Sequence, residues 1–204
     1  SFSPDILEGG DWSGMSQNAD NLFTSEEIEN YYDIAMDIKL NEGNDFPNGL
    51  GSEIKHDWIQ EIWDKINPGV KVLSHYLETG PLDMSNEWVG SQYTIIVCLT
   101  PDMKPEDGGV LELWRPNLTD EMKAMALNTP YTFNAEHEHN MDILESYWPK
   151  PGRQVVFDAR IPHVARAVES DKFRISLVFK GTTKGMPKLE EDEHGYVHEA
   201  SEVE

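Results

Sequence analysis

The stretch that decides the fold is "FDARIPHVARAVESDKFRIS", residues 157–176, where β-strand patterns lie on both sides of one histidine. The residue pattern predicts strands over 153–159, 163–168 and 174–180, because strand side chains alternate between two faces. His163 lies at the turn between two of these strands, and Arg174 follows eleven positions later. An imidazole can bind a metal and a guanidinium can bind a carboxylate, so the two residues are a candidate site. The alternative is a locally bonded strand-end histidine and an arginine paired with a surface acid.

Helical patterns come first in the chain and strand patterns follow. Apolar residues recur at helical spacing over 24–41, where Thr24 or Ser25 can cap the helix, and again over 54–67. Three further strand patterns precede the opening stretch, over residues 70–78, 93–100 and 109–115. Two helices followed by at least six strands, without βαβ alternation, predict a mainly β fold with supporting helices, either a sandwich or a jelly roll.

The same patterns predict three regions along the chain. Residues 1–69 form an N-terminal arm and supporting helices, 70–182 the β core, and 183–204 an acidic C-terminal tail. The core carries a long insert, 116–150, which contains a short helical pattern over Asp120–Leu127 and the histidines His137 and His139. A His-x-His pair in a strand has both rings on one face and could complete a metal site with His163. The alternative is a solvated polar loop.

The composition narrows the classes of partner. A net charge of −22 repels nucleic acid and anionic membranes, so we expect neither as a partner. This charge favours a cationic substrate or a basic protein partner, although it is also typical of a very soluble protein. Cys98 is the only cysteine, which excludes an intrachain disulfide. No apolar run reaches the roughly 18 residues of a membrane span, and no secretory signal is visible, so we expect a cytoplasmic location.

The order of these features resembles the double-stranded β-helix of the Fe(II)/2-oxoglutarate-dependent oxygenases, in particular their prolyl-hydroxylase-like branch. "VLSHYLETG" (72–80) resembles the first barrel strand with its tyrosine, here Tyr76. Three later segments continue the resemblance. "YTIIVCLTPDMKPEDGGVLELW" (93–114) resembles the strand–turn–strand unit, and "KPGRQVVFDARIPHVARAV" (150–168) resembles the segment of the distal metal histidine. "FRISLVFK" (173–180) resembles the last strand. The resemblance implies a jelly-roll, cupin-like core behind an N-terminal helical layer.

The resemblance also implies a chemistry, a hydroxylase-type oxidation that uses Fe(II) and 2-oxoglutarate. Iron is held in such sites by two imidazoles and one carboxylate. His163 matches the distal imidazole. Arg174 matches the residue that pairs with the far carboxylate of 2-oxoglutarate, for which a planar guanidinium is suited. Tyr76 and Thr94 are expected beside the same co-substrate.

The first two metal ligands of this family form a His-x-Asp or His-x-Glu motif shortly after the first-strand tyrosine. The corresponding window, "GPLDMSNEWVGSQYT" (80–94), contains no histidine. An alignment on Ser85-Asn86-Glu87 keeps Glu87 as a metal ligand, whereas one on Trp88-Val89-Gly90 keeps no ligand. Two functions therefore stay open: an oxygenase with an atypical metal shell, or a catalytically degenerate jelly roll used for binding or structure. A third hypothesis is a cupin-like module that binds another metal through His163, His137 and His139.

Overall fold

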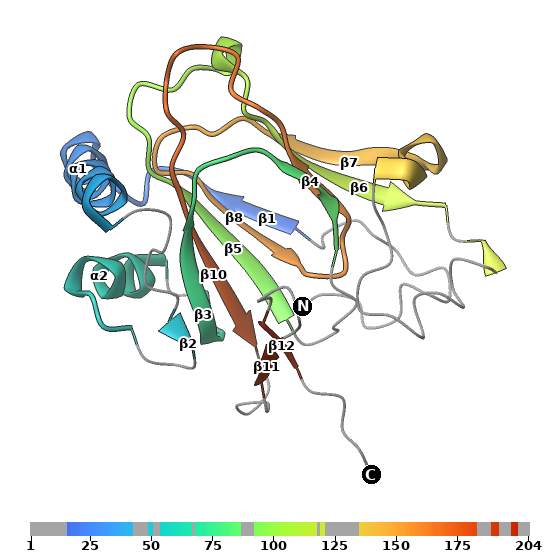
Figure 1. Cartoon of the computed structure of the whole chain (residues 1–204), viewed down its shortest axis with the longest axis horizontal. Coiled ribbons are helices and arrows are strands. Elements are labelled where there is room, and N and C mark those ends of the chain that lie inside the picture. Colours follow the sequence, from blue (N-terminus) through green and yellow to red (C-terminus); the bar gives the residue numbers. More distant parts are fainter. Residues whose placement is uncertain are drawn as a thin grey trace.

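The computed structural model of this chain describes residues 16–42, 49–50, 54–66, 68–86, 92–117, 119–120, 135–182, 189–191 and 197–199. Most of its strands form two antiparallel sheets that face each other (Figure 1). The larger sheet has the strand order β1-β8-β5-β10-β3-β2, and the smaller one has the order β4-β9-β6-β7. The expected mainly β jelly-roll architecture with supporting helices is confirmed.

The strands of the larger sheet come from distant parts of the sequence. They are β1 (Ser16–Ala19), β2 (Gly49–Leu50), β3 (Lys71–Glu78), β5 (Gln92–Cys98), β8 (Gln154–Asp158) and β10 (Ser176–Thr182). The smaller sheet contains β4 (Leu82–Ser85), β6 (Leu111–Pro116), β7 (Met141–Tyr147) and β9 (His163–Ala165). In the acidic tail, β11 (Leu189–Glu191) pairs with β12 (Val197–Glu199). The short 3-10 helices are η1 (Pro105–Asp107) and η2 (Ala135–Asn140).

Two helices, α1 (Ser25–Glu42) and α2 (Asp57–Ile66), cover the outer face of the larger sheet (Figure 1). Thr24 caps α1 as expected, because the Thr24 hydroxyl accepts from the Glu27 amide and the Glu27 carboxylate accepts from the Thr24 amide. The apolar stripes of both helices are buried against the sheet in the main hydrophobic core: Ile28, Tyr31, Ala35, Trp58, Ile59, Ile62 and Ile66. No helix in the described part of the chain is long and apolar enough to cross a membrane.

Alternation along the strands separates the two faces of the larger sheet. Leu177 and Phe179 of β10 belong to the core under the helices, as do Ile95 and Val97 of β5. The intervening side chains of these strands face the smaller sheet instead. There a second apolar cluster, formed by Leu111, Leu113, Val155, Phe157 and Ile161, joins the sheets. The space beside this second cluster contains the candidate site.

The structure refines several of the expected elements. The strand pattern over 174–180 begins later, at Ser176, so Arg174 lies just before β10. The strands β4 and β7 were not expected from the sequence. His137 and His139 lie in η2 and not in a strand, so the strand geometry that would put both rings on one face is not formed. The helical pattern over Asp120–Leu127 lies almost entirely outside the described residues. The division into arm, core and tail stays a prediction.

Candidate functional site

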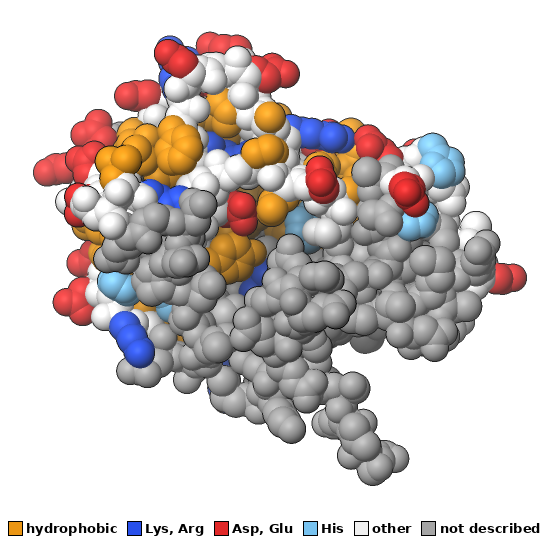
Figure 2. Space-filling model, in the orientation of Figure 1, with side chains coloured by type: hydrophobic (Ala, Val, Ile, Leu, Met, Phe, Trp, Pro, Cys, Tyr) orange, Lys and Arg blue, Asp and Glu red, His pale blue; other side chains and the backbone are white. Residues whose placement is uncertain are grey.

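A pocket lies between the inner faces of the two sheets, and its empty space of about 640 Å³ includes a part that is open to solvent. Three neighbouring strands of the larger sheet supply one wall, with every second residue facing the pocket: Tyr76 and Glu78 of β3, Thr94, Ile96 and Cys98 of β5, and Ser176, Val178 and Lys180 of β10. His163 and Ala165 of β9 lie on the opposite wall, with Leu111 of β6. In Figure 2, hydrophobic side chains and a histidine lie near the middle of the face, while acidic side chains are frequent around it.

The structure brings together four of the five residues expected at the site. Tyr76, Thr94, His163 and Arg174 all line this pocket, although they come from four separate segments. His75, the neighbour of Tyr76, points the other way and packs near Phe179 under the helices, as strand alternation requires. Glu87, the expected carboxylate ligand, lies outside the described residues.

The His163 side chain is held in one orientation. Its Nδ1 lies 2.9 Å from the carbonyl oxygen of Ile161, and its ring packs on Phe157 at a centroid distance of 4.9 Å. A carbonyl only accepts, so Nδ1 carries the proton and Nε2 keeps its lone pair. Burial, reinforced by the positive charge of Lys180, lowers the pKa of His163 to about 4. The imidazole is therefore neutral at physiological pH, with an acceptor nitrogen available.

A buried ion pair fixes the turn that leads to His163. The Arg160 guanidinium donates to both carboxylate oxygens of Asp158, at 2.9 and 2.7 Å. The two side chains are only 7% and 1% exposed, so this is not a surface ion pair. The Asn86 side chain donates to the backbone carbonyl of Arg160 at 3.1 Å, which ties β4 to the same turn. The ion pair and this bond together hold the segment that presents the imidazole.

Arg174 is engaged by the backbone. Its guanidinium donates to three carbonyl oxygens: to Gly109 at 2.8 Å, to Arg166 at 3.0 Å and to Gly80 at 2.7 Å. The residue is 6% exposed, and burial lowers the pKa of the guanidinium. The planar fork that suits a carboxylate thus joins three loops that approach it from different parts of the chain. This arrangement gives Arg174 a structural role whether or not a ligand reaches it.

Lys180 is a second cation in the pocket, and sequence reasoning missed it. Its ammonium group donates to the Thr94 hydroxyl at 2.8 Å, and Thr94 is the residue directly opposite it in the β5–β10 pair. An ammonium has three N–H donors, so Lys180 can also bind a ligand. The signal was present in the sequence. Positions 174, 176, 178 and 180 share one face of a regular strand, so an inward Arg174 implies an inward Lys180.

Glu78 is an acidic group in the same pocket, and it too was missed. It lies two residues after Tyr76 and therefore on the same face of β3. Burial raises the pKa of its carboxyl group, whereas the nearby charges of Arg174, Lys39 and Lys180 act in the opposite direction. Among the described residues, the pocket is thus lined by two cations, one carboxyl group and one neutral imidazole.

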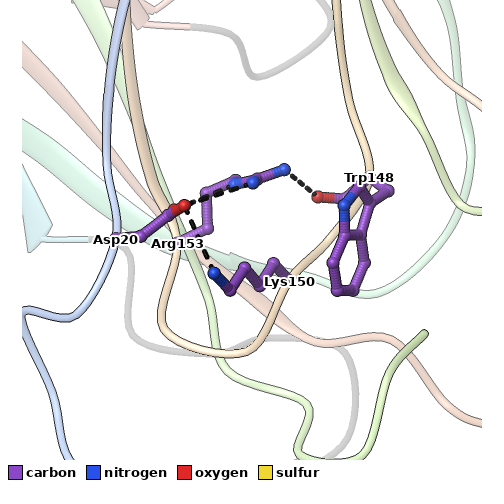
Figure 3. Close-up of polar contacts among 4 residues, drawn as sticks. All are labelled: Asp20, Trp148, Lys150 and Arg153. Carbon is purple, nitrogen blue, oxygen red and sulfur yellow. Dashed lines mark hydrogen bonds and ion pairs between the residues drawn. The ribbon is translucent and has the colours of Figure 1, made fainter. Parts of the chain in front are cut away.

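An aromatic segment closes another side of the pocket through Tyr147, Trp148 and Pro149. Figure 3 shows how this segment is held: Arg153 donates to the carbonyl of Trp148 at 2.9 Å and to the carboxylate of Asp20 at 3.0 Å. The guanidinium also lies over the Trp148 ring, 5.4 Å from its centroid. Asp20 follows β1, so the N-terminal strand supports the pocket wall from behind.

The described residues do not form a three-ligand metal centre. In the β4–β9 pair, Ser85 lies directly opposite His163. Among the residues that the structure describes, no three His, Cys, Asp or Glu side chains are grouped so that they could hold a metal ion. This includes His137 and His139, so the cupin-like combination with His163 is not formed. One imidazole does not fit the iron site of two imidazoles and one carboxylate.

Solved structures support the fold. No protein-family model and no curated protein sequence matches the chain. The non-heme alpha-ketoglutarate-dependent carbocyclase SnoK from nogalamycin biosynthesis superposes with a TM-score of 0.58 at 12% identity, covering 89% of this chain and 87% of its own. HygX from Streptomyces hygroscopicus, solved with nickel and 2-oxoglutarate, gives 0.54 at 11% identity, covering 83% of each chain.

A prolyl hydroxylase from Trichoplax adhaerens, bound to a peptide of hypoxia inducible factor, gives a TM-score of 0.52 at 11% identity. That match covers 83% of this chain and 84% of the hydroxylase. At such identities the likeness establishes the fold. The resemblance to the prolyl-hydroxylase-like oxygenases is thus confirmed at the level of the double-stranded β-helix.

Proposed function

We propose that this chain is a carboxylate-binding relative of the Fe(II)/2-oxoglutarate-dependent oxygenases, with 2-oxoglutarate as its first candidate ligand. The observation that carries the proposal is the Lys180–Thr94 pair, an ammonium and a hydroxyl side by side on the inner face of the barrel. Both groups can donate hydrogen bonds to a carboxylate. A charged donor binds an anion more strongly in a half-buried pocket than in open water.

The lining of the pocket suits a small ligand. Its walls combine apolar side chains with a few convergent polar groups. Ile96, Leu111 and Val178 would contact the carbon chain of the ligand. Arg174 would add long-range positive charge without a direct bond. Tyr76, on the strand beside β10, also lines the pocket and would contact the same ligand.

The second candidate is an active Fe(II)/2-oxoglutarate-dependent oxygenase of the hydroxylase type with an atypical metal shell. The observation in its favour is the neutral imidazole of His163, whose Nε2 is available to a metal. Glu87 would be the carboxylate ligand. We place this candidate second because Ser85, not a histidine, lies opposite His163. In this candidate the bound iron would supply oxygen activation, and the acidic surface would favour a cationic substrate or a basic protein partner.

Calorimetric titration with 2-oxoglutarate tests the proposal. We expect saturable binding to the intact chain, and loss of that binding in a Thr94→Val variant, which keeps the side-chain shape but removes the hydroxyl. An anaerobic titration with Fe(II) plus 2-oxoglutarate then separates the two candidates. A visible charge-transfer band that is absent in His163→Ala would establish the oxygenase, whereas binding without such a band supports the carboxylate-binding protein. Absence of 2-oxoglutarate binding under all of these conditions would refute both candidates.

A further inference from the structure

We infer that the ammonium group of Lys180 replaces the metal cation of this barrel, so that the carboxylate ligand binds without any divalent ion. The inference rests on the proposed function, because it concerns how the same pocket holds its ligand. It goes further because it assigns the positive charge that binds the ligand to one side chain of the protein and not to a metal ion.

The first support is the placement of Lys180. It lines the same pocket as His163, the one imidazole among the described lining residues. A fixed positive charge repels a divalent cation that enters the same pocket, since the Coulomb energy scales with the charge. The Lys180 charge therefore disfavours a metal ion in this pocket.

The second support is that Lys180 is oriented. Its ammonium group is bonded to the hydroxyl of Thr94, a residue that is 2% exposed and fixed within the central strand β5. A lysine on a solvated strand would extend its flexible side chain into water. Here the cation is anchored inside the barrel and keeps two N–H donors for a ligand.

The third support is that two features of the site agree. The cross-strand partner of His163 is Ser85, whose hydroxyl is a poor metal ligand, and a lysine supplies a positive charge in the pocket. Arg174 does not perform this task, because its guanidinium is bonded to three backbone carbonyls. A dicarboxylate taken out of water needs a compensating cation, and Lys180 is the charged donor directed into this space.

Calorimetry with 2-oxoglutarate on the full chain tests the inference. The wild-type protein is titrated once in EDTA and once, anaerobically, with excess Mn(II). The same titration in EDTA follows for Lys180→Met, which keeps the length of the side chain, and for Lys180→Arg, which keeps its charge. Lys71→Met is the matched control, because it removes the same charge from an exposed position at the start of β3. Urea denaturation establishes that each variant is folded.

We expect the same dissociation constant with EDTA and with Mn(II). Lys180→Met should weaken binding about tenfold or more, which corresponds to the loss of one charged contact. Lys180→Arg should recover part of the affinity, and Lys71→Met should stay within about twofold of the wild type.

The outcomes distinguish the inference from the proposed function. Binding that requires Mn(II) or Fe(II) would overturn the inference and leave the proposed function standing. Unchanged binding in a folded Lys180→Met variant would also overturn it. If 2-oxoglutarate binds to the wild type neither in EDTA nor with metal, the proposed function fails and the inference fails with it.

Discussion

Replacement of Arg174 by methionine separates a structural from a ligand-binding role for this residue. The guanidinium joins the carbonyls of Gly80, Gly109 and Arg166, and all three hydrogen bonds are lost in the variant. Hydrogen bonds that involve a charged group contribute roughly 1.5–3 kcal/mol each. Removal of the guanidinium also ends the cost of burying its charge, which offsets part of this loss. We therefore expect the free energy of unfolding to fall by about 3–4 kcal/mol.

Urea denaturation followed by circular dichroism measures this difference. The control is Arg115→Met, since Arg115 is 52% exposed and 3.8 Å from Asp142, an ion pair expected to contribute less than about 1 kcal/mol. Arg174→Lys should recover only part of the loss, because one ammonium cannot reproduce the planar fork. A loss below about 1 kcal/mol in Arg174→Met, together with complete loss of 2-oxoglutarate binding, would refute the structural role. It would instead assign Arg174 to the co-substrate, as the sequence resemblance implies.

Two further variants test the supporting layers of the fold. Burial lowers the pKa of His75 from its ordinary value of 6.5, and its Nδ1 finds no hydrogen-bond partner among the described residues. The unfolded chain therefore binds this proton more readily, and the free energy of unfolding should fall as the pH drops below about 6.5. His75→Phe should flatten this pH dependence of the free energy of unfolding, measured by urea titration. Parallel pH profiles of the wild type and the variant would contradict a role of His75. The hydrogen bonds and charge of Arg153 hold the pKa of Asp20 below its usual value. The ion pair therefore stabilises the fold at pH values above the usual pKa of an aspartate, and this stabilisation is lost as the pH falls through the lowered pKa of Asp20. Asp20→Asn should lower the free energy of unfolding by about 1 kcal/mol at pH 7 and should leave it unchanged in acid, where Asp20 of the wild type is protonated. An equal loss at pH 7 and in acid would count against the ion pair.

Strand alternation was the most reliable information in the sequence. The resemblance predicts Tyr76 inside the barrel, and alternation then requires its neighbour His75 on the opposite face, as the structure has them. The same rule would have placed Glu78 and Lys180 in the pocket, because each lies an even number of residues from an expected inward position. The family resemblance assigns a role to neither residue, so it did not predict them. A charged residue at an inward strand position is therefore by itself an indication of a candidate site residue.

Other features depend on contacts that local patterns do not encode. The strand β7 was missed because most of its side chains are exposed and its apolar residues do not alternate regularly. The role of Arg174 depends on carbonyls from residues 80, 109 and 166, which only the folded chain brings to one point. A residue type at a familiar position indicates a site, but its hydrogen-bond partners decide whether the side chain is available to a ligand.

The charged groups of the pocket have separate tasks that follow from their partners. Arg174 is bonded to backbone and holds loops together, whereas Lys180 has one bond to a hydroxyl and further donors to offer. Glu78 lies near both cations, and burial raises the pKa of its carboxyl group while the charges of these cations lower it. With Ser85 beside His163, the barrel contains one imidazole and a fixed ammonium. In the site that we propose, this ammonium group supplies the positive charge that a bound carboxylate requires.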